Sequence, residues 1–306
     1  MMFSKKTMKK TALFSAAAAL LTLFGCQRNT SNSGEESRKA EPVSTEFTVT
    51  ALNVGKADAL ILQTPNSVTV IDTGNKGDGK DIEKYLSAQG IAKIDRMIIT
   101  HFDKDHVGGA ARVINRVEVG EIIVPDYTSK VPDYESFIEK VNEKGKELTV
   151  MKAGTNTEWK SDDVSFRLYA ANKNDYGRDE ENDFSLCLYA VHGGNTYLFA
   201  GDAEAARQQE LLSLKLGKVT FLKFPYHGNY LKTTENFLNA TAPKYALITC
   251  SPEEDADPST VDALTKRGVT AYYTKNGTYS FVSNGSEITV VEGGTDKAPG
   301  SIDQAG

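Results

Sequence analysis

The stretch that decides the fold prediction lies at residues 98–109 and reads IITHFDKDHVGG. An apolar strand leads into this turn, and a helix is expected directly after it. Neutral imidazole and carboxylate groups are ligands for Zn²⁺, Mn²⁺ or iron. Because such a turn can point alternate side chains to one side, we expect His101 and Asp103 to share one metal ion. Asp105 and His106 would then reach a second ion; the alternative is a solvated acidic turn.

Two distant segments have the same character, because each places one ligand-type residue at the end of an apolar strand. Asp202 follows the strand expected at residues 196–199, and His227 follows the strand expected at residues 219–223. Alone, Asp202 would be a helix N-cap and His227 a loop histidine. Together with the central turn they complete a ligand set for two metals. The fourth histidine, His192, precedes two glycines and is expected to be an exposed turn residue.

The segment HFDKDH resembles the HxHxDH metal motif of the metallo-β-lactamase superfamily, and Asp103 at the second His position resembles the variant of ComEC-type competence proteins. Five further stretches resemble segments of that subfamily in the same order, over roughly residues 48–283: LNVGKADA (52–59), IDTG (71–74), FSL (184–186), FAGDAE (199–204) and PYHG (225–228).

The chain also departs from that pattern. Lys56 and Ala57 replace Gln-Gly, Tyr226 replaces the first His of HHG, and Asn229 replaces its Ser. An acidic segment at residues 253–257 stands where the subfamily often has Gly-His-Pro. These changes affect the surroundings of the metal ligands, so they bear on the substrate more than on metal binding.

The resemblance implies a four-layer αββα sandwich, an α/β fold of two mixed β-sheets with helices outside. It implies one or two divalent ions, Zn²⁺ or Mn²⁺, with Asp202 bridging them and His227 completing the second site. Asp105 would also orient the nucleophile and carry its proton. Asp58 and Asp72 would hold the metal loop by hydrogen bonds from outside the ligand set.

The function that this resemblance implies is a metal-dependent hydrolase, of phosphodiesterase or nuclease type, that uses a metal-activated hydroxide. Its substrate would be a small-molecule or nucleic-acid phosphodiester, and no protein partner is predicted. The alternatives are hydrolysis of another cell-envelope ester, or a non-catalytic surface binding protein that retains the fold. β-Lactam hydrolysis is not expected, because Asp103 stands where that activity would call for histidine.

The N-terminus reads as a targeting segment. Four lysines precede the apolar run 11–24, which is too short to span a membrane and is typical of a signal peptide. The run ends at Gly25-Cys26, which resembles a bacterial lipobox, so Cys26 is the expected lipidation site of an extracytoplasmic, membrane-anchored lipoprotein. A plain secretory signal is the alternative. Without residues 1–25 the formal net charge would be about −10, which does not favour nonspecific phosphate binding.

Composition supports one folded domain between polar ends. Of 306 residues, 40% are hydrophobic and 25% charged, which excludes a disordered chain and a multispan membrane protein. Cys187 and Cys250 are expected as buried free thiols, with a disulfide as the alternative. Strands and helices alternate in both halves, with strands Leu148–Met151 and Val164–Tyr169 expected in succession. The expected organisation is a signal peptide (1–25), a flexible tether (26–46), the metallo-β-lactamase-like domain (47–292) and a disordered tail (293–306).

Overall fold

The computed structural model describes residues 45–177 and 181–293, which belong to one compact unit of the chain, residues 40–306. The predicted signal peptide, Cys26, nearly all of the predicted tether and residues 294–306 lie outside the described residues. The predicted domain boundaries therefore remain predictions. Among the described residues, no helix is both long and apolar enough to cross a membrane.

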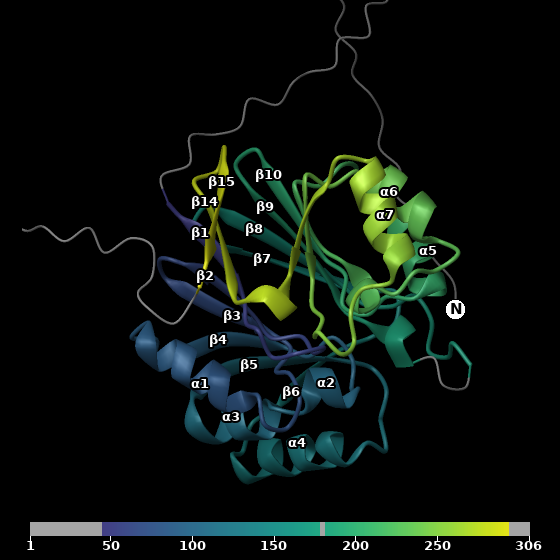
Figure 1. Cartoon of the computed structure of the whole chain (residues 1–306). Coiled ribbons are helices and arrows are strands. Elements are labelled where there is room, and N and C mark those ends of the chain that lie inside the picture. The colour runs from purple at the N-terminus through teal and green to yellow at the C-terminus, as the bar shows by residue number, and fades with distance from the viewer. Residues whose placement is uncertain (1–44, 178–180, 294–306) are drawn as a thin grey trace, which may run out of the picture. The chain divides into compact units, whose positions relative to one another are not determined.

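The first sheet is mixed and has eight strands in the order β15-β14-β1-β2-β3-β4-β5-β6. Strands β1 to β3 pair antiparallel, whereas β3 to β6 pair parallel. Helices cover one face of this sheet (Figure 1). The strands are β1 (Phe47–Ala51), β2 (Leu60–Thr64), β3 (Ser67–Ile71), β4 (Lys93–Ile98), β5 (Glu118–Pro125), β6 (Leu148–Met151), β14 (Tyr279–Ser283) and β15 (Ile288–Glu292), and the helices are α1 (Gly79–Ala88), α2 (Lys104–Val107), α3 (Ala110–Arg116) and α4 (Pro132–Glu143).

The second sheet has seven strands in the order β13-β12-β11-β10-β9-β8-β7. Strands β7 to β10 are antiparallel, and β10 to β13 are parallel. Three helices lie on the side away from the first sheet (Figure 1). The strands are β7 (Asn156–Ser161), β8 (Val164–Tyr169), β9 (Cys187–His192), β10 (Asn195–Phe199), β11 (Phe221–Lys223), β12 (Tyr245–Ile248) and β13 (Thr270–Tyr273), and the helices are α5 (Ala205–Ser213), α6 (Thr234–Thr241) and α7 (Pro258–Lys266).

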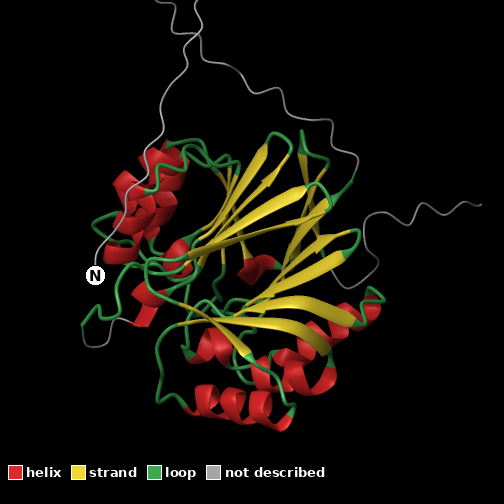
Figure 2. Cartoon of the chain, turned by 180° about the vertical axis from the view of Figure 1, so that it is seen from behind, coloured by secondary structure: helices red, strands yellow, loops and turns green. Residues whose placement is uncertain are grey.

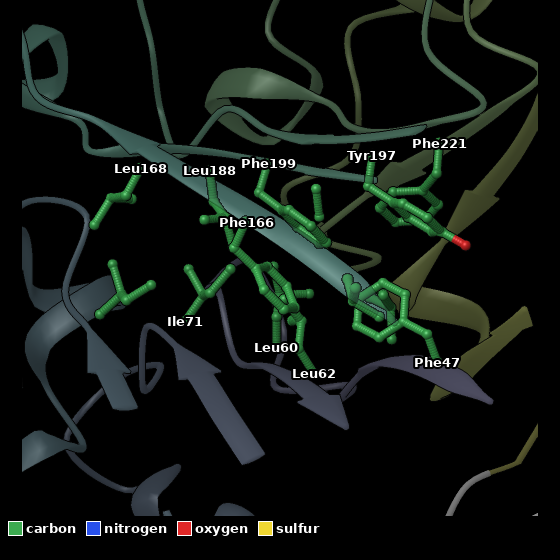
Figure 3. Packing of buried hydrophobic residues seen from close by; sticks show 14 of the residues in the cluster. Phe47, Leu60, Leu62, Ile71, Phe166, Leu168, Leu188, Tyr197, Phe199 and Phe221 are labelled. Carbon is green, nitrogen blue, oxygen red and sulfur yellow. The ribbon is translucent and has the colours of Figure 1, made fainter. Parts of the chain in front are cut away.

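Alternation along the strands builds three hydrophobic layers. In β4, Ile98 joins the cluster between the two sheets, while its neighbour Met97 joins the cluster under the helices of the first sheet. Aromatic side chains fill the space between the sheets: Phe47 meets Phe166 edge-on with ring centroids 5.8 Å apart, and Phe221 lies in the same layer (Figure 3). Full burial of one such side chain contributes roughly 1.5–3 kcal/mol. Helix, sheet, sheet and helix therefore stack in four layers (Figure 2), which confirms the predicted fold.

Two local expectations need correction. Strand β7 was not expected, because its sequence NTEWKS is polar and alternates on a half-exposed edge. The helix expected directly after the central turn begins only at Ala110 as α3, because the turn itself contains the short helix α2, and Gly108 and Gly109 join the two. A Cβ at Gly109 would lie 2.2 Å from the carbonyl oxygen of Thr73. Glycine is therefore required where the central turn packs against the chain that follows β3.

Candidate metal centre

The segments that follow three strands converge on one cluster of histidine and aspartate side chains. His101 to His106 follow β4, Asp202 follows β10, and His227 lies in the short 3-10 helix η2 (Pro225–Gly228) after β11. Strand β4 belongs to the first sheet, and the parallel neighbours β10 and β11 belong to the second, so the cluster joins residues from the carboxyl ends of strands in both sheets. Asp202 is not a helix N-cap, because that position of α5 belongs to Glu204.

The outer face of this cluster, as we name it, consists of the Nε2 atoms of His101, His106 and His227 together with Asp103, Asp105 and Asp202. All three Nε2 atoms are buried, and none has a hydrogen-bond partner of acceptable geometry among the described residues. Buried polar atoms are nearly always partnered in native proteins. Three such atoms in one place indicate that a ligand completes the site.

Asp202 lies at the centre of the outer face. Its Oδ2 atom is 2.9 Å from His227 Nε2 and 3.3 Å from His106 Nε2. His101, His106 and Asp202 form one set of ligand atoms close enough to hold an ion, and Asp105, His106 and His227 form another. In the second set, Asp105 Oδ2 lies 3.3 Å from His227 Nε2. The structure thus brings five of the six predicted ligands close enough together to bind one metal ion or two neighbouring metal ions.

Asp103 is the sixth predicted ligand and lies at the rim. Its side chain is 39% exposed, and its Oδ2 is 3.7 Å from His101 Nε2. Among the described residues it belongs to no group of three ligand atoms. Its part in metal binding stays a prediction, weaker in geometric support than that of Asp202.

The inner face of the cluster consists of Asp58, Asp72, Thr100, Thr249 and Lys223, which contact the ligands from behind. Asp72 accepts hydrogen bonds from the Thr100 backbone N–H at 2.7 Å and the Thr100 hydroxyl at 2.6 Å, and its Oδ2 lies 2.8 Å from His106 Nδ1. A carboxylate only accepts, so His106 Nδ1 donates and its Nε2 presents a lone pair to the outer face. Asp72 adopts a left-handed backbone (φ 56°) to make these contacts.

The other two histidines are fixed in the same tautomer. Thr100 gives its only hydroxyl proton to Asp72, so it accepts from His101 Nδ1 at 3.1 Å. His227 Nδ1 donates to the carbonyl oxygen of Thr249 at 2.9 Å. The Thr249 hydroxyl in turn donates to Asp58 Oδ1 at 2.6 Å. Asp58 and Asp72 therefore both hold ligands from outside the set, where the resemblance placed them.

Charge dominates the protonation of this cluster when no ion is bound. Burial acts to lower the pKa of His227, but Asp202 and Asp105 raise it to about 9. Burial also opposes a charged His106, yet Asp202 and Asp72 hold its pKa well above the usual range. Burial acts to raise the pKa of Asp202, and His227, His106 and Lys223 lower it well below the ordinary value. Protons on His106 and His227 therefore compete with any cation for the free cluster.

Lys223 is the residue of this cluster that sequence reasoning missed. It is the last residue of β11, it is fully buried, and it forms an ion pair with Asp58 and another with Asp202. The available signal was a lysine that ends an otherwise apolar strand, four residues before His227. The hydroxyls of Thr100 and Thr249 were missed as well, since threonine in a strand carries no mark of such a role.

The prediction that His192 is an exposed turn residue is wrong. The expected exposed turn residue is fully buried at the end of β9, where its Nδ1 lies 2.9 Å from the Ser283 hydroxyl and its ring meets Phe47 edge-on. That end of β9 is opposite to the end of β10 that carries Asp202. Cys187 and Cys250 are buried free thiols, as predicted.

Comparison with known proteins identifies the family. The model of the metallo-beta-lactamase superfamily matches residues 52–251, about two thirds of the chain. The chain belongs to the metallo-β-lactamase superfamily. The matched range contains every residue of the inner and outer faces.

Among superfamily proteins, the chain is distantly related to competence proteins. It is 26% identical over 226 residues to ComE operon protein 3 of Bacillus subtilis, covering 67% of this chain and 28% of that protein. It is 27% identical over 205 residues to Recombination protein 2 of Haemophilus influenzae, covering 65% and 24%. The chain thus spans only about a quarter of the length of these relatives. The metallo-beta-lactamase fold protein YhfI from Bacillus subtilis shares the fold, with a TM-score of 0.54, 11% identity, and coverage of 78% of this chain and 100% of that one.

The donors present fit a divalent cation. Three imidazole nitrogens, which bind a metal once deprotonated, and two buried or half-buried carboxylates, Asp202 and Asp105, offer the nitrogen and oxygen ligands that Zn²⁺ and Mn²⁺ take in proteins. The outer hydrogen bonds that orient each imidazole are also those expected behind metal-bound histidines. The cluster is therefore consistent with the binding of a divalent metal ion.

Proposed function

We propose that this protein is a metal-dependent hydrolase that cleaves a phosphodiester, as a phosphodiesterase or nuclease does. The observation that carries the proposal is the set of three buried, unpartnered histidine Nε2 atoms around Asp202 and Asp105 in a superfamily member. The relation to competence proteins supports a phosphodiester over other esters, because one relative is named a recombination protein and another a competence protein. DNA uptake itself is not part of the proposal.

Each side chain has a part in such a reaction. One or two divalent ions at the outer face would act as Lewis acids, making water a better nucleophile and offsetting negative charge on the phosphate. Asp105, whose side chain is 20% exposed, is the group that can accept the proton of attacking water. Asp72 and the Asp58–Thr249 pair keep the imidazoles in the tautomer that leaves Nε2 free. This preorganisation reduces the movement needed during the reaction.

The test is turnover of a panel with added Mn²⁺ or Zn²⁺: bis-nitrophenyl phosphate, single-stranded DNA and double-stranded DNA. We expect hydrolysis of at least one phosphodiester, and a loss of about 100-fold or more in Asp105→Asn, which cannot take the proton. The matched control is Asp262→Asn on the exposed side of α7, which should keep full activity. Bound metal without any hydrolysis would indicate a binding protein. Cleavage of carboxylic esters alone would indicate an envelope ester hydrolase.

We also propose that the enzyme works outside the cytoplasm, anchored to the membrane by lipid on Cys26. The support is the sequence alone: an apolar run that ends at Gly25-Cys26, followed by a polar stretch. The Cys26→Ser variant should leave the membrane fraction or stay unprocessed. A variant that still carries lipid and fractionates as before would overturn the anchor.

A further inference from the structure

The ammonium group of Lys223 is buried directly behind the candidate metal centre. Its side chain is fully shielded from solvent, although burying a charge costs free energy unless partners compensate it. It donates to the carbonyl oxygen of Gly201 at 3.0 Å, lies 3.3 Å from Asp202 Oδ1, and forms an ion pair with Asp58 Oδ2. An ammonium has three N–H donors, and three acceptors surround this one. The contacts are therefore complete without any further ligand.

The contact between Lys223 and Asp202 gives the two carboxylate oxygens of Asp202 different partners. Oδ1 is held by Lys223 at the inner face, whereas Oδ2 lies between His106 Nε2 and His227 Nε2 at the outer face. A carboxylate with one oxygen fixed cannot rotate freely. It can therefore present only the other oxygen to an ion at the outer face.

The same ammonium reaches a second ligand indirectly. Asp58 shares its oxygens between Lys223 and the Thr249 hydroxyl, and Thr249 accepts the Nδ1 proton of His227. Lys223, Asp58 and Thr249 thus form one chain of contacts behind Asp202 and His227. Both ligands come from segments that follow neighbouring strands, β10 and β11, so this chain fixes their separation.

We propose that Lys223 is a positioning residue of the metal centre, which holds Asp202 so that it offers one oxygen, Oδ2, to the bound cation. This inference rests on the proposed function only in that the cluster binds a divalent ion. A purely structural lysine would compensate two buried carboxylates and leave the ion's surroundings unchanged. The positioning role and the purely structural role differ in whether removal of the ammonium changes the coordination of the bound ion.

The test uses the double variant Lys223→Met/Asp58→Asn. Lys223→Met alone would leave two buried carboxylates without a counter-charge and unfold part of the protein. The double variant removes one charge of each sign, so the net attraction of the site for a cation is preserved. Asn at position 58 still accepts from Thr249. The matched control, Lys84→Met/Asp81→Asn, removes an exposed pair of the same residue types on α1.

The measurements are the visible absorption of the Co²⁺-loaded full chain and its dissociation constant for Zn²⁺ by chelator competition. Without the ammonium, Asp202 can bind through both oxygens, so we expect weaker Co²⁺ absorption as the coordination number rises. We expect about tenfold weaker Zn²⁺ binding, in the range found for partners behind metal ligands. Asp58→Asn alone should keep the wild-type Co²⁺ spectrum, because the contact of Lys223 with Asp202 remains.

A wild-type spectrum and affinity in the double variant would overturn the positioning role. A wild-type protein that takes up no Co²⁺ or Zn²⁺ would overturn it together with the metal centre. A wild-type protein that binds metal but hydrolyses nothing would overturn the proposed hydrolase and leave the role of Lys223 standing.

Discussion

The inner and outer faces of the metal cluster both contain histidine nitrogens and carboxylates, but the two faces differ in the hydrogen bonds that these groups make. On the inner face, the Nδ1 atoms and the carboxylates of Asp58 and Asp72 have short, defined partners within the fold. On the outer face, the three buried Nε2 atoms make no hydrogen bond of acceptable geometry among the described residues, and those of His106 and His227 lie against carboxylates. The inner-face groups therefore hold the ligand side chains in place, and the outer-face groups are available to bind a ligand.

The largest effect is expected from the outer face, in Asp202→Ala. Asp202 is a member of the first set of ligand atoms, and its Oδ2 also lies 2.9 Å from His227 Nε2 of the second set, so metal affinity should fall by more than the roughly 10–100-fold typical of supporting partners. Metal content by mass spectrometry after dialysis checks this. Asp262→Ala is the surface control and should retain its metal. Unchanged stoichiometry in Asp202→Ala would remove that residue from the site.

A smaller effect is expected from the inner face, in Asp72→Asn. Asparagine tolerates the left-handed backbone of this position, but its amide group would meet the Nδ1 proton of His106. We expect metal affinity to fall by about 10–100-fold, and the free energy of unfolding of the metal-free protein to fall by roughly 1–3 kcal/mol. The matched control is Asp162→Asn, a surface aspartate with φ 50°. Equal effects of the two substitutions would show that backbone strain, and not the contact with His106, explains them.

Removal of the ion should expose the charges of the outer face as a pH dependence. Folding raises the pKa of His227 to about 9 from an ordinary value of 6.5, so its protonated form stabilises the fold. That contribution is complete below about pH 6.5 and is lost as pH rises through about 9. In chelator-treated protein, the free energy of unfolding from urea titrations should therefore decrease between these values. His227→Asn should reduce this slope, while His106, whose pKa is also raised, keeps part of it. A wild-type protein whose stability rises over this range would contradict the assignment.

The smallest effect is expected at the rim, in Asp103→His. Because the Asp103 side chain is partly exposed and only approaches His101, its replacement should leave thermal stability unchanged. An imidazole in place of a hard oxygen ligand should shift the preference from Mn²⁺ toward Zn²⁺. Competition between the two ions, read by metal analysis, measures that shift. The same preference before and after the change would place Asp103 outside the ligand set.

The sequence was informative where chemistry and local order coincide. The resemblance to the metallo-β-lactamase superfamily predicted the four layers, and the ligand types at three strand ends predicted a cluster that the fold assembles. Strand β7 was not predicted, because a polar edge strand with two half-exposed faces lacks an apolar pattern. Sequence reasoning also did not predict the contacts of Lys223, Thr249 and His192, for another reason. A side chain's burial depends on which distant strands flank it, and pairs such as Asp58 with Thr249 are 191 residues apart.

The central claim is that a divalent cation binds at the outer face, and anomalous X-ray diffraction tests it most directly. Crystals of the protein soaked with Mn²⁺ or Zn²⁺ would be measured at the absorption edge of the metal. We expect an anomalous peak within bonding distance of His106 Nε2, His227 Nε2 and Asp202 Oδ2, with a second near His101 Nε2 if two ions bind. A fully soaked crystal with no peak among these atoms, or with its peaks only elsewhere on the protein, would contradict it.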